Sequence, residues 1–90
     1  MGKIRMLMID DNKNLVKMVN EYFRGHNEIE LSLFAYYGEE GLNIIINEAD
    51  NFDLILLDLI MPKKDGIYVL DEMLKRSINK KVIVATSYNT

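Results

Sequence analysis

The sequence predicts an α/β domain built on a doubly wound parallel sheet, and three observations carry this prediction. Short apolar runs alternate with segments whose apolar residues recur at helical spacing, in the order strand–helix three times and then a strand. Residues 52–57 form a nearly continuous apolar run, which is typical of a parallel strand buried on both faces by helices. Ninety residues with one continuous pattern make one domain, residues 1–90. This alternation favours right-handed crossovers, with helices on both sides of the sheet.

The first predicted strand covers residues 4–9 and ends at an acidic pair, Asp10 and Asp11. The helix expected next has apolar residues at helical spacing, namely Leu15, Val16, Met18, Val19, Tyr22 and Phe23. Asp11 or Asn12 can cap the start of this helix, because short polar side chains accept hydrogen bonds from the first free backbone N–H groups. Gly25 is expected to end it.

The second strand and second helix have weaker signals. Residues 30–36 alternate as in an outer strand, although Phe34 interrupts the polar side. Residues 38–49 are expected to form a helix, with apolar residues at Leu42, Ile45, Ile46 and Ala49. Gly41 and three consecutive isoleucines make this segment a poor intrinsic helix, so the prediction depends on its context.

The third strand, residues 52–57, stops abruptly at Asp58. Residues 61–66 then form a loop with turn chemistry, since the loop contains a proline and an Asp-Gly pair. A third helix follows, marked by Ile67, Leu70, Met73 and Leu74. Residues 81–86 are expected to form the fourth strand.

Composition excludes several classes of protein. The chain is 49% hydrophobic and 28% charged, as in ordinary globular domains. A net charge of −3 argues against nucleic-acid binding by this segment, which requires a basic face. The absence of cysteine excludes disulfides and thiolate metal sites. No apolar run reaches membrane-spanning length, so we expect a cytoplasmic location.

Polar side chains gather at one edge of the predicted sheet. Asp10 and Asp11 follow the first strand, Asp58 follows the third, and Thr86 ends the fourth. The first and third strands are neighbours at the switch point of a doubly wound sheet, so we expect the three carboxylates in one crevice with a hydroxyl beside them. Carboxylates this close repel one another, and a hard divalent cation with oxygen ligands resolves the conflict. The sequence therefore predicts a Mg²⁺ site.

The same arrangement suits phosphoryl transfer. An Asp carboxylate is a known nucleophile for phosphoryl groups, and we interpret Asp58 as the reactive residue. A bound cation neutralises the incoming phosphoryl group and aligns it with the nucleophile. Thr86 is then placed to hydrogen-bond a phosphoryl oxygen.

These residues and motifs resemble the receiver domain of two-component response regulators. The resemblance is carried by the acidic pair after the first strand, by Asp58, by the stretch DLIMPKKDG and by Thr86, and it spans the whole chain. Within that family, the segments IDDNKNLV and DLIMPKKDG are similar to those of regulators that initiate sporulation in spore-forming bacteria. The resemblance implies a CheY-like, flavodoxin-like fold with strand order 2-1-3-4.

The resemblance also implies a role for each matching residue. Asp58 is expected to accept a phosphoryl group from a histidine kinase or a phosphotransfer protein. Asp11 is expected to bind Mg²⁺ directly, Asp10 largely through water, and Ile60 through its backbone carbonyl, with Asp58 completing the set. Thr86 is expected to act as the switch hydroxyl. A protein of this kind modifies itself and turns over no external substrate.

Receiver domains normally continue with a further helix, a fifth strand and a fifth helix, and this additional stretch carries a Lys that pairs with the phosphoacceptor. Lys80 and Lys81 lie at the wrong end of the predicted sheet to replace it. We therefore expect a receiver domain truncated after its fourth strand, most simply a piece of a longer regulator. Residues 82–84 are then an exposed apolar edge, which favours pairing with another copy. Besides a piece of a longer regulator and a domain completed by pairing with another copy, a third explanation is a natural minimal receiver.

Two other functions remain as alternatives. The first is a truncated receiver that no longer signals and acts as an oligomerising interaction module. The second is a Mg²⁺-dependent phosphohydrolase of the haloacid-dehalogenase type. That family requires a second Asp two residues after the nucleophile, whereas Asn12 follows Asp10 and Lys13 follows Asp11 at that spacing. The single histidine, His26, is expected to be an exposed loop residue rather than a phosphorelay group.

Overall fold

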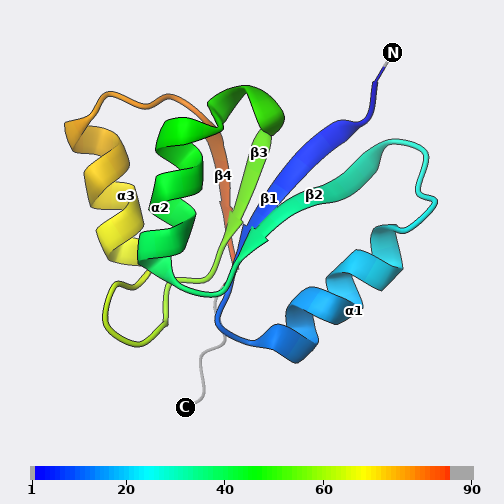
Figure 1. Cartoon of the computed structure of the whole chain (residues 1–90), viewed down its shortest axis with the longest axis horizontal. Helices are drawn as coiled ribbons and strands as arrows, with labels where there is room; N and C mark the ends of the chain where they lie inside the picture. Colours follow the sequence, from blue (N-terminus) through cyan, green and yellow to red (C-terminus); the bar gives the residue numbers. More distant parts are fainter. Residues whose placement is uncertain (1, 86–90) are drawn as a thin grey trace.

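A computed structural model describes residues 2–85, which form four parallel strands and three helices around one sheet (Figure 1). The strands lie in the order β2-β1-β3-β4, as predicted. The elements in chain order are β1 (Ile4–Ile9), α1 (Lys13–Phe23), β2 (Ile29–Ala35), α2 (Gly38–Asn47), the 3₁₀ turn η1 (Ala49–Asn51), β3 (Leu54–Leu57), α3 (Gly66–Lys75) and β4 (Lys81–Val84).

The register of the strands aligns their carboxyl ends. In β1 and β3, Met6 lies opposite Leu54 and Ile9 lies opposite Leu57. The ladder continues one residue further, because the N–H of Asp58 donates to the carbonyl of Ile9 over 3.0 Å. The residues that follow β1 and β3 therefore emerge side by side at the same edge of the sheet.

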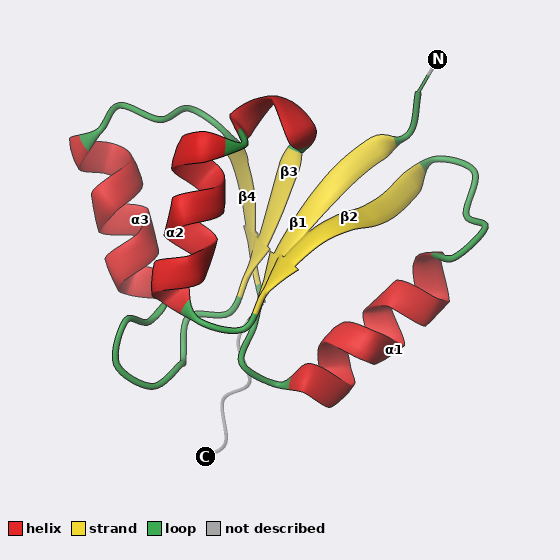
Figure 2. Cartoon of the chain, in the orientation of Figure 1, coloured by secondary structure: helices red, strands yellow, loops and turns green. Residues whose placement is uncertain are grey.

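The helices cover the two faces of the sheet unequally. Figure 2 shows α2 and α3 together on one face and α1 on the other. The main core lies on the face of α2 and α3, where the fully buried residues include Leu7, Ile9, Ile45, Phe52, Ile55, Leu57 and Val69.

One expectation about β3 is wrong. We predicted a strand buried on both faces, but only Ile55 and Leu57 are fully buried, whereas Leu54 and Leu56 are half-buried. Among residues 2–85, α1 is the only helix on the face of Leu54 and Leu56, and it packs mainly against β2. On this face, β3 and β4 are therefore less covered than the sequence pattern suggests, whereas Met6 and Met8 of β1 are buried.

Several boundaries differ from those predicted. The helix expected at 38–49 ends at Asn47, and η1 follows it. The strand expected at 52–57 begins only at Leu54, although the N–H of Asp53 already donates to the carbonyl of Arg5 over 2.7 Å. The second strand begins one residue early, at Ile29, and β4 is described as far as Val84.

The strand β4 forms one edge of the described sheet and pairs only with β3. Its side chains Ile83 and Val84 are 52% and 45% exposed, so the expected apolar edge is present in this part of the chain. Over residues 2–85, no helix has the length and apolar character needed to span a membrane.

Candidate functional site

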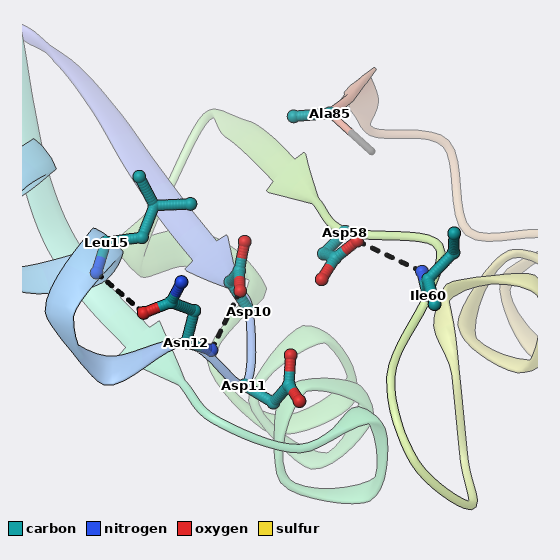
Figure 3. A pocket seen from close by; sticks show the side chains of 7 residues that line it. All are labelled: Asp10, Asp11, Asn12, Leu15, Asp58, Ile60 and Ala85. Carbon is teal, nitrogen blue, oxygen red and sulfur yellow. Dashed lines mark hydrogen bonds between the residues drawn. The ribbon is translucent and has the colours of Figure 1, made fainter. Parts of the chain in front are cut away.

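Three carboxylates meet at the carboxyl edge of the sheet. Asp10 follows β1, Asp11 is the next residue, and Asp58 follows β3 (Figure 3). One oxygen from each can be chosen so that all three lie within 4.8 Å of one another. The convergence predicted from the strand pattern is therefore present. Thr86, the fourth predicted member, lies outside the described residues.

The start of α1 holds Asp10 in place. The Oδ1 atom of Asp10 accepts a hydrogen bond from the backbone N–H of Asn12 at 2.9 Å. The side chain of Asn12 in turn accepts from the N–H of Leu15 at 3.0 Å and so caps the helix. Of the two predicted caps, Asn12 takes this role, which leaves the Asp11 carboxylate for the cluster.

Asp58 is oriented by its own loop. Its Oδ1 atom accepts a hydrogen bond from the N–H of Ile60 at 3.0 Å, which closes a tight turn directly after β3. Ile60 lines the cleft beside Asp58, and its side chain is 58% exposed. This turn places both Asp58 and Ile60 at the same cleft.

The site is electrostatically unfavourable without a cation. Asp10 is only 6% exposed, and burial raises its pKa, with the charges of Asp58 and Asp11 acting in the same direction. The hydrogen bond from the N–H of Asn12 partly opposes this rise. The cleft has a volume of about 430 Å³ and no basic side chain among its described lining residues, which are Asp10, Asp11, Asn12, Leu15, Asp58, Ile60 and Ala85.

A hard divalent cation fits this donor set. Carboxylate oxygens and water are the ligands that Mg²⁺ prefers, and the cleft has room for both. A cation would also offset the repulsion that raises the pKa of Asp10. The residues present therefore suit the metal that the sequence predicts.

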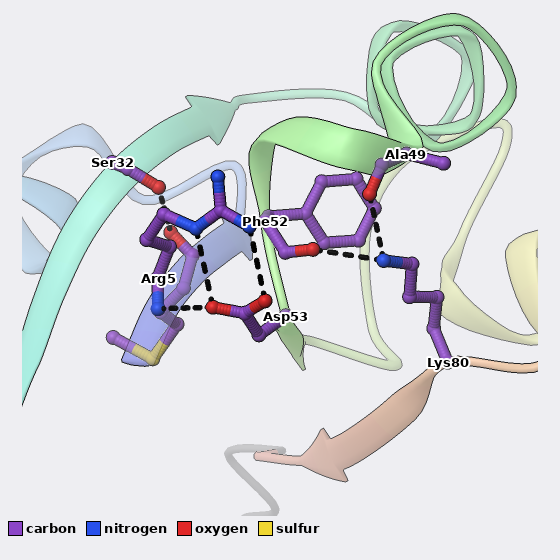
Figure 4. Close-up of polar contacts among 7 residues, drawn as sticks. Arg5, Ser32, Ala49, Phe52, Asp53 and Lys80 are labelled. Carbon is purple, nitrogen blue, oxygen red and sulfur yellow. Dashed lines mark hydrogen bonds and ion pairs between the residues drawn. The ribbon is translucent and has the colours of Figure 1, made fainter. Parts of the chain in front are cut away.

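Lys80 and Lys64 make contacts away from the three carboxylates. The ammonium group of Lys80 donates to the carbonyls of Ala49 and Phe52, at the opposite end of β3 (Figure 4). Lys64 lies on the β3–α3 loop, with its ammonium group over the ring of Tyr68. The expectation that Lys80 sits at the wrong end of the sheet is borne out by these contacts.

The sequence analysis did not identify two residues that line the cleft, and it misjudged the exposure of His26. Leu15 and Ala85 line the cleft, and nothing in the strand pattern singles them out. His26 is half-buried rather than exposed. Its Nδ1 atom accepts hydrogen bonds from the N–H groups of Glu28 and Ile29, so it orders the turn into β2. A turn of this kind depends on a local geometry that the sequence pattern does not reveal.

Comparison with known proteins identifies a consistent set of relatives. The family described as "Response regulator receiver domain" matches residues 6–90. A receiver domain of a Francisella response regulator is 30% identical, with a TM-score of 0.83, over 98% of this chain and 69% of that one. The response regulator domain of Thermotoga maritima CheB is 27% identical, with a TM-score of 0.82, over 96% of this chain and 62% of that one.

A third relative was solved in a complex. A chain in the structure of CheX, CheY, BeF₃ and Mg²⁺ from Borrelia burgdorferi is 29% identical, with a TM-score of 0.81. The match covers 97% of this chain and 64% of that one. The present chain thus spans roughly two thirds of the length of these three solved structures.

Proposed function

Because the chain belongs to the family of response regulator receiver domains, the phosphoacceptor modules of two-component systems, we propose that Asp58 is its phosphoryl acceptor. The observation that carries this proposal is the meeting of Asp10, Asp11 and Asp58 at the carboxyl edge of the sheet. Of the three, Asp58 is the one on the loop after β3, half-exposed and oriented by the N–H of Ile60.

We propose that Mg²⁺ binds beside this acceptor. The carboxylates of Asp10, Asp11 and Asp58 and the backbone carbonyl of Ile60 would hold the ion, with Asp10 acting largely through water. When bound, the ion neutralises charge on the phosphoryl group and lowers the barrier to its transfer. The solved relative that contains BeF₃ and Mg²⁺ supports this choice of metal.

The transfer step follows from the hydrogen bonding of Asp58. The N–H of Ile60 donates to Oδ1, which holds the carboxylate in one orientation and leaves Oδ2 to act as the nucleophile. Oδ2 attacks the phosphorus of a phosphohistidine, the P–N bond breaks, and its electron pair returns to the imidazole of the donor. The product is an acyl phosphate on Asp58. Thr86, outside the described residues, remains a predicted partner for a phosphoryl oxygen.

The partner we propose is a histidine kinase or a phosphotransfer protein. The chain modifies itself and turns over no external substrate in this scheme, and the expected compartment is the cytoplasm. A role in transcription or sporulation rests only on the resemblance of the segments IDDNKNLV and DLIMPKKDG.

Intact-mass spectrometry after incubation with Mg²⁺ and acetyl phosphate tests the assignment of Asp58. We expect a Mg²⁺-dependent gain of one phosphoryl group, which Asp58→Asn reduces to the background level. Asp65→Asn is the matched control, because Asp65 lies on the same loop and caps α3 through its side chain, a role that Asn also fills. A gain that persists in Asp58→Asn, or no gain in the unaltered protein, would contradict the proposal.

We also propose that the β4 edge mediates self-association. Ile83 and Val84 are exposed on a strand that has one described neighbour, β3. Unpaired strand edges with apolar side chains are templates for pairing with another chain. The interaction would join two copies through the same edge, in the symmetric manner of most homodimers.

A further inference from the structure

We propose that Gly38 is a positioning residue for the acidic site, because the loop that follows Asp58 rests directly on its Cα atom. The inference rests on the proposed function and concerns how the β3–α3 loop is held in place for phosphoryl transfer and Mg²⁺ binding. Gly38 touches none of the three carboxylates. Its effect would pass through the loop to Ile60.

The contact between Gly38 and the loop leaves no space for a side chain. A Cβ atom at Gly38 would lie 1.9 Å from the carbonyl oxygen of Lys64 and 2.8 Å from its carbonyl carbon. These are backbone atoms, so no side-chain rotation relieves the clash. A methyl group would push the loop away by about 1 Å, since packed atoms do not approach closer than van der Waals contact.

The backbone of Gly38 does not itself require glycine. Gly38 is the first residue of α2, whereas the left-handed glycine among the described residues is Gly25. Glycine costs about 1 kcal/mol relative to alanine inside a helix, and somewhat less at its first residue. The preceding residue, Tyr37, provides no side-chain cap that would compensate. Close packing against Lys64 is therefore the physical reason for glycine at this position.

The two ends of the β3–α3 loop, at Asp58 and Gly66, are also closely packed. At Gly66, a Cβ atom would lie 2.4 Å from the carbonyl oxygen of Asp58. The N–H of Gly66 also donates to the carbonyl of Leu59 over 3.2 Å. Within the loop, Lys63 has a φ of 62°, a left-handed conformation that is unfavourable for a lysine. The loop is therefore held at Gly66 and at Lys64, and we expect a displacement of Lys64 to alter the position of Ile60.

A second contact joins the start of α2 to the start of α3. The hydroxyl of Tyr68, on α3, donates to the carboxylate of Glu39 on α2 over 3.4 Å. The ammonium group of Lys64 lies 4.5 Å from the centre of the Tyr68 ring. The first turn of α2 thus contacts both the loop and the start of α3, and Gly38 sets how closely they approach.

Gly38→Ala tests the proposal by two NMR measurements. In Mg²⁺-free buffer, we expect the amide resonances of residues 60, 61 and 63–66 to shift, since Pro62 has no amide N–H. In a Mg²⁺ titration, we expect the dissociation constant to rise about tenfold, at the lower end of the effect of mutating residues that support metal ligands. Neither measurement depends on phosphorylation.

Gly41→Ala is the matched control on the same helix. A Cβ atom at Gly41 would meet the side chain of Ile9 in the core, at 2.5 Å, and does not contact the loop. We expect this variant to alter stability while leaving the resonances of residues 61–66 in place. Tyr68→Phe is the second test variant, because it loosens the contact with Glu39 without adding bulk and is expected to fold. It should shift the same loop resonances by a smaller amount.

The outcomes separate the inference from the function on which it rests. Unshifted loop resonances in both Gly38→Ala and Tyr68→Phe would overturn the inference. An equal loss of Mg²⁺ affinity in Gly38→Ala and Gly41→Ala would also overturn it, because the loss would then be a general effect of perturbing α2. Failure of the unaltered protein to bind Mg²⁺ would instead contradict the proposed function, while the shifts in Mg²⁺-free buffer would still report on the contact.

Discussion

Asp10 combines a favourable position for metal binding with a cost in stability. Its side chain is buried, which raises its pKa and disfavours the charged carboxylate that a metal site requires. The two other carboxylates of the cluster add repulsion. The residue is therefore explained by its proposed function rather than by folding.

We predict that Asp10→Asn stabilises the protein in Mg²⁺-free buffer at neutral pH by about 0.5–1 kcal/mol, within the range for relieving an unfavourable site. Asparagine removes the buried charge and keeps an oxygen that can accept the hydrogen bond from the N–H of Asn12. The same change should weaken Mg²⁺ binding. Urea unfolding and a Mg²⁺ titration measure the two effects.

Asp11→Asn provides the comparison for this prediction. Asp11 belongs to the same cluster but is half-buried, so its neutralisation should weaken Mg²⁺ binding with a smaller gain in stability. Equal stabilities of Asp10→Asn and the unaltered protein would show that burial of Asp10 is not costly.

Between elements, contacts at the amino end of the sheet hold β1, β3 and β4 together. Arg5 on β1 binds Asp53, just before β3, through its backbone N–H and two guanidinium nitrogens at 2.9, 3.2 and 3.1 Å (Figure 4). Lys80, just before β4, donates to carbonyls of Ala49 and Phe52. These polar contacts lie at the opposite edge of the sheet from the acidic site. They help to hold the register of the strands without contacting the three carboxylates.

The Arg5–Asp53 pair predicts a pH dependence. Hydrogen bonds from Arg5 lower the pKa of Asp53 from 3.8 to about 2. Because the pKa is depressed in the folded state, the pair stabilises the fold above pH 3.8, and this contribution is lost as the pH falls towards 2. We predict that the urea midpoint falls less between pH 4.5 and pH 2.5 in Asp53→Asn than in the unaltered protein.

The control for this prediction is the exposed ion pair between Arg24 and Glu21 on α1. Pairs of this type contribute little to stability, so Glu21→Gln should leave the pH dependence of the urea midpoint unchanged. An acid-induced loss of stability that is the same in Asp53→Asn and the unaltered protein would show that the pair contributes nothing measurable.

On the scale of the whole molecule, the described sheet is covered well on one face and partly on the other. The main core lies beneath α2 and α3, while α1 packs mainly against β2 on the opposite face. Apolar side chains of β4 are consequently exposed, and within residues 2–85 this strand pairs only with β3. This exposure is the physical basis of the proposed self-association.

We predict that Ile83→Lys weakens concentration-dependent association several-fold in sedimentation velocity experiments. A lysine on an edge strand disfavours pairing, because it places like charges on facing strands of a symmetric pair. Ile67→Lys is the control, since Ile67 is similarly exposed, at 57%, but lies on α3 rather than on β4. If both variants associate like the unaltered protein, the β4 edge is not the contact surface.

Much of the site could be predicted, because it depends on a rule that links sequence to position. Parallel strands end at a common edge, so residues directly after two neighbouring strands meet, as Asp10 and Asp58 do. The lengths of the elements were less predictable. Apolar spacing continues to Ala49, but the helix ends at Asn47 because the backbone at Glu48 leaves the helical conformation.

The sequence by itself determined the alternation of strands and helices and the sheet edge at which the acidic residues gather. These follow from periodicity and from chain order, which are local properties. Only the tertiary structure decided which residue caps α1, how fully each sheet face is covered, and why Gly38 has no side chain. These features depend on the distance between segments far apart in the chain, such as the 1.9 Å from a Cβ at Gly38 to the carbonyl oxygen of Lys64, which no local pattern encodes.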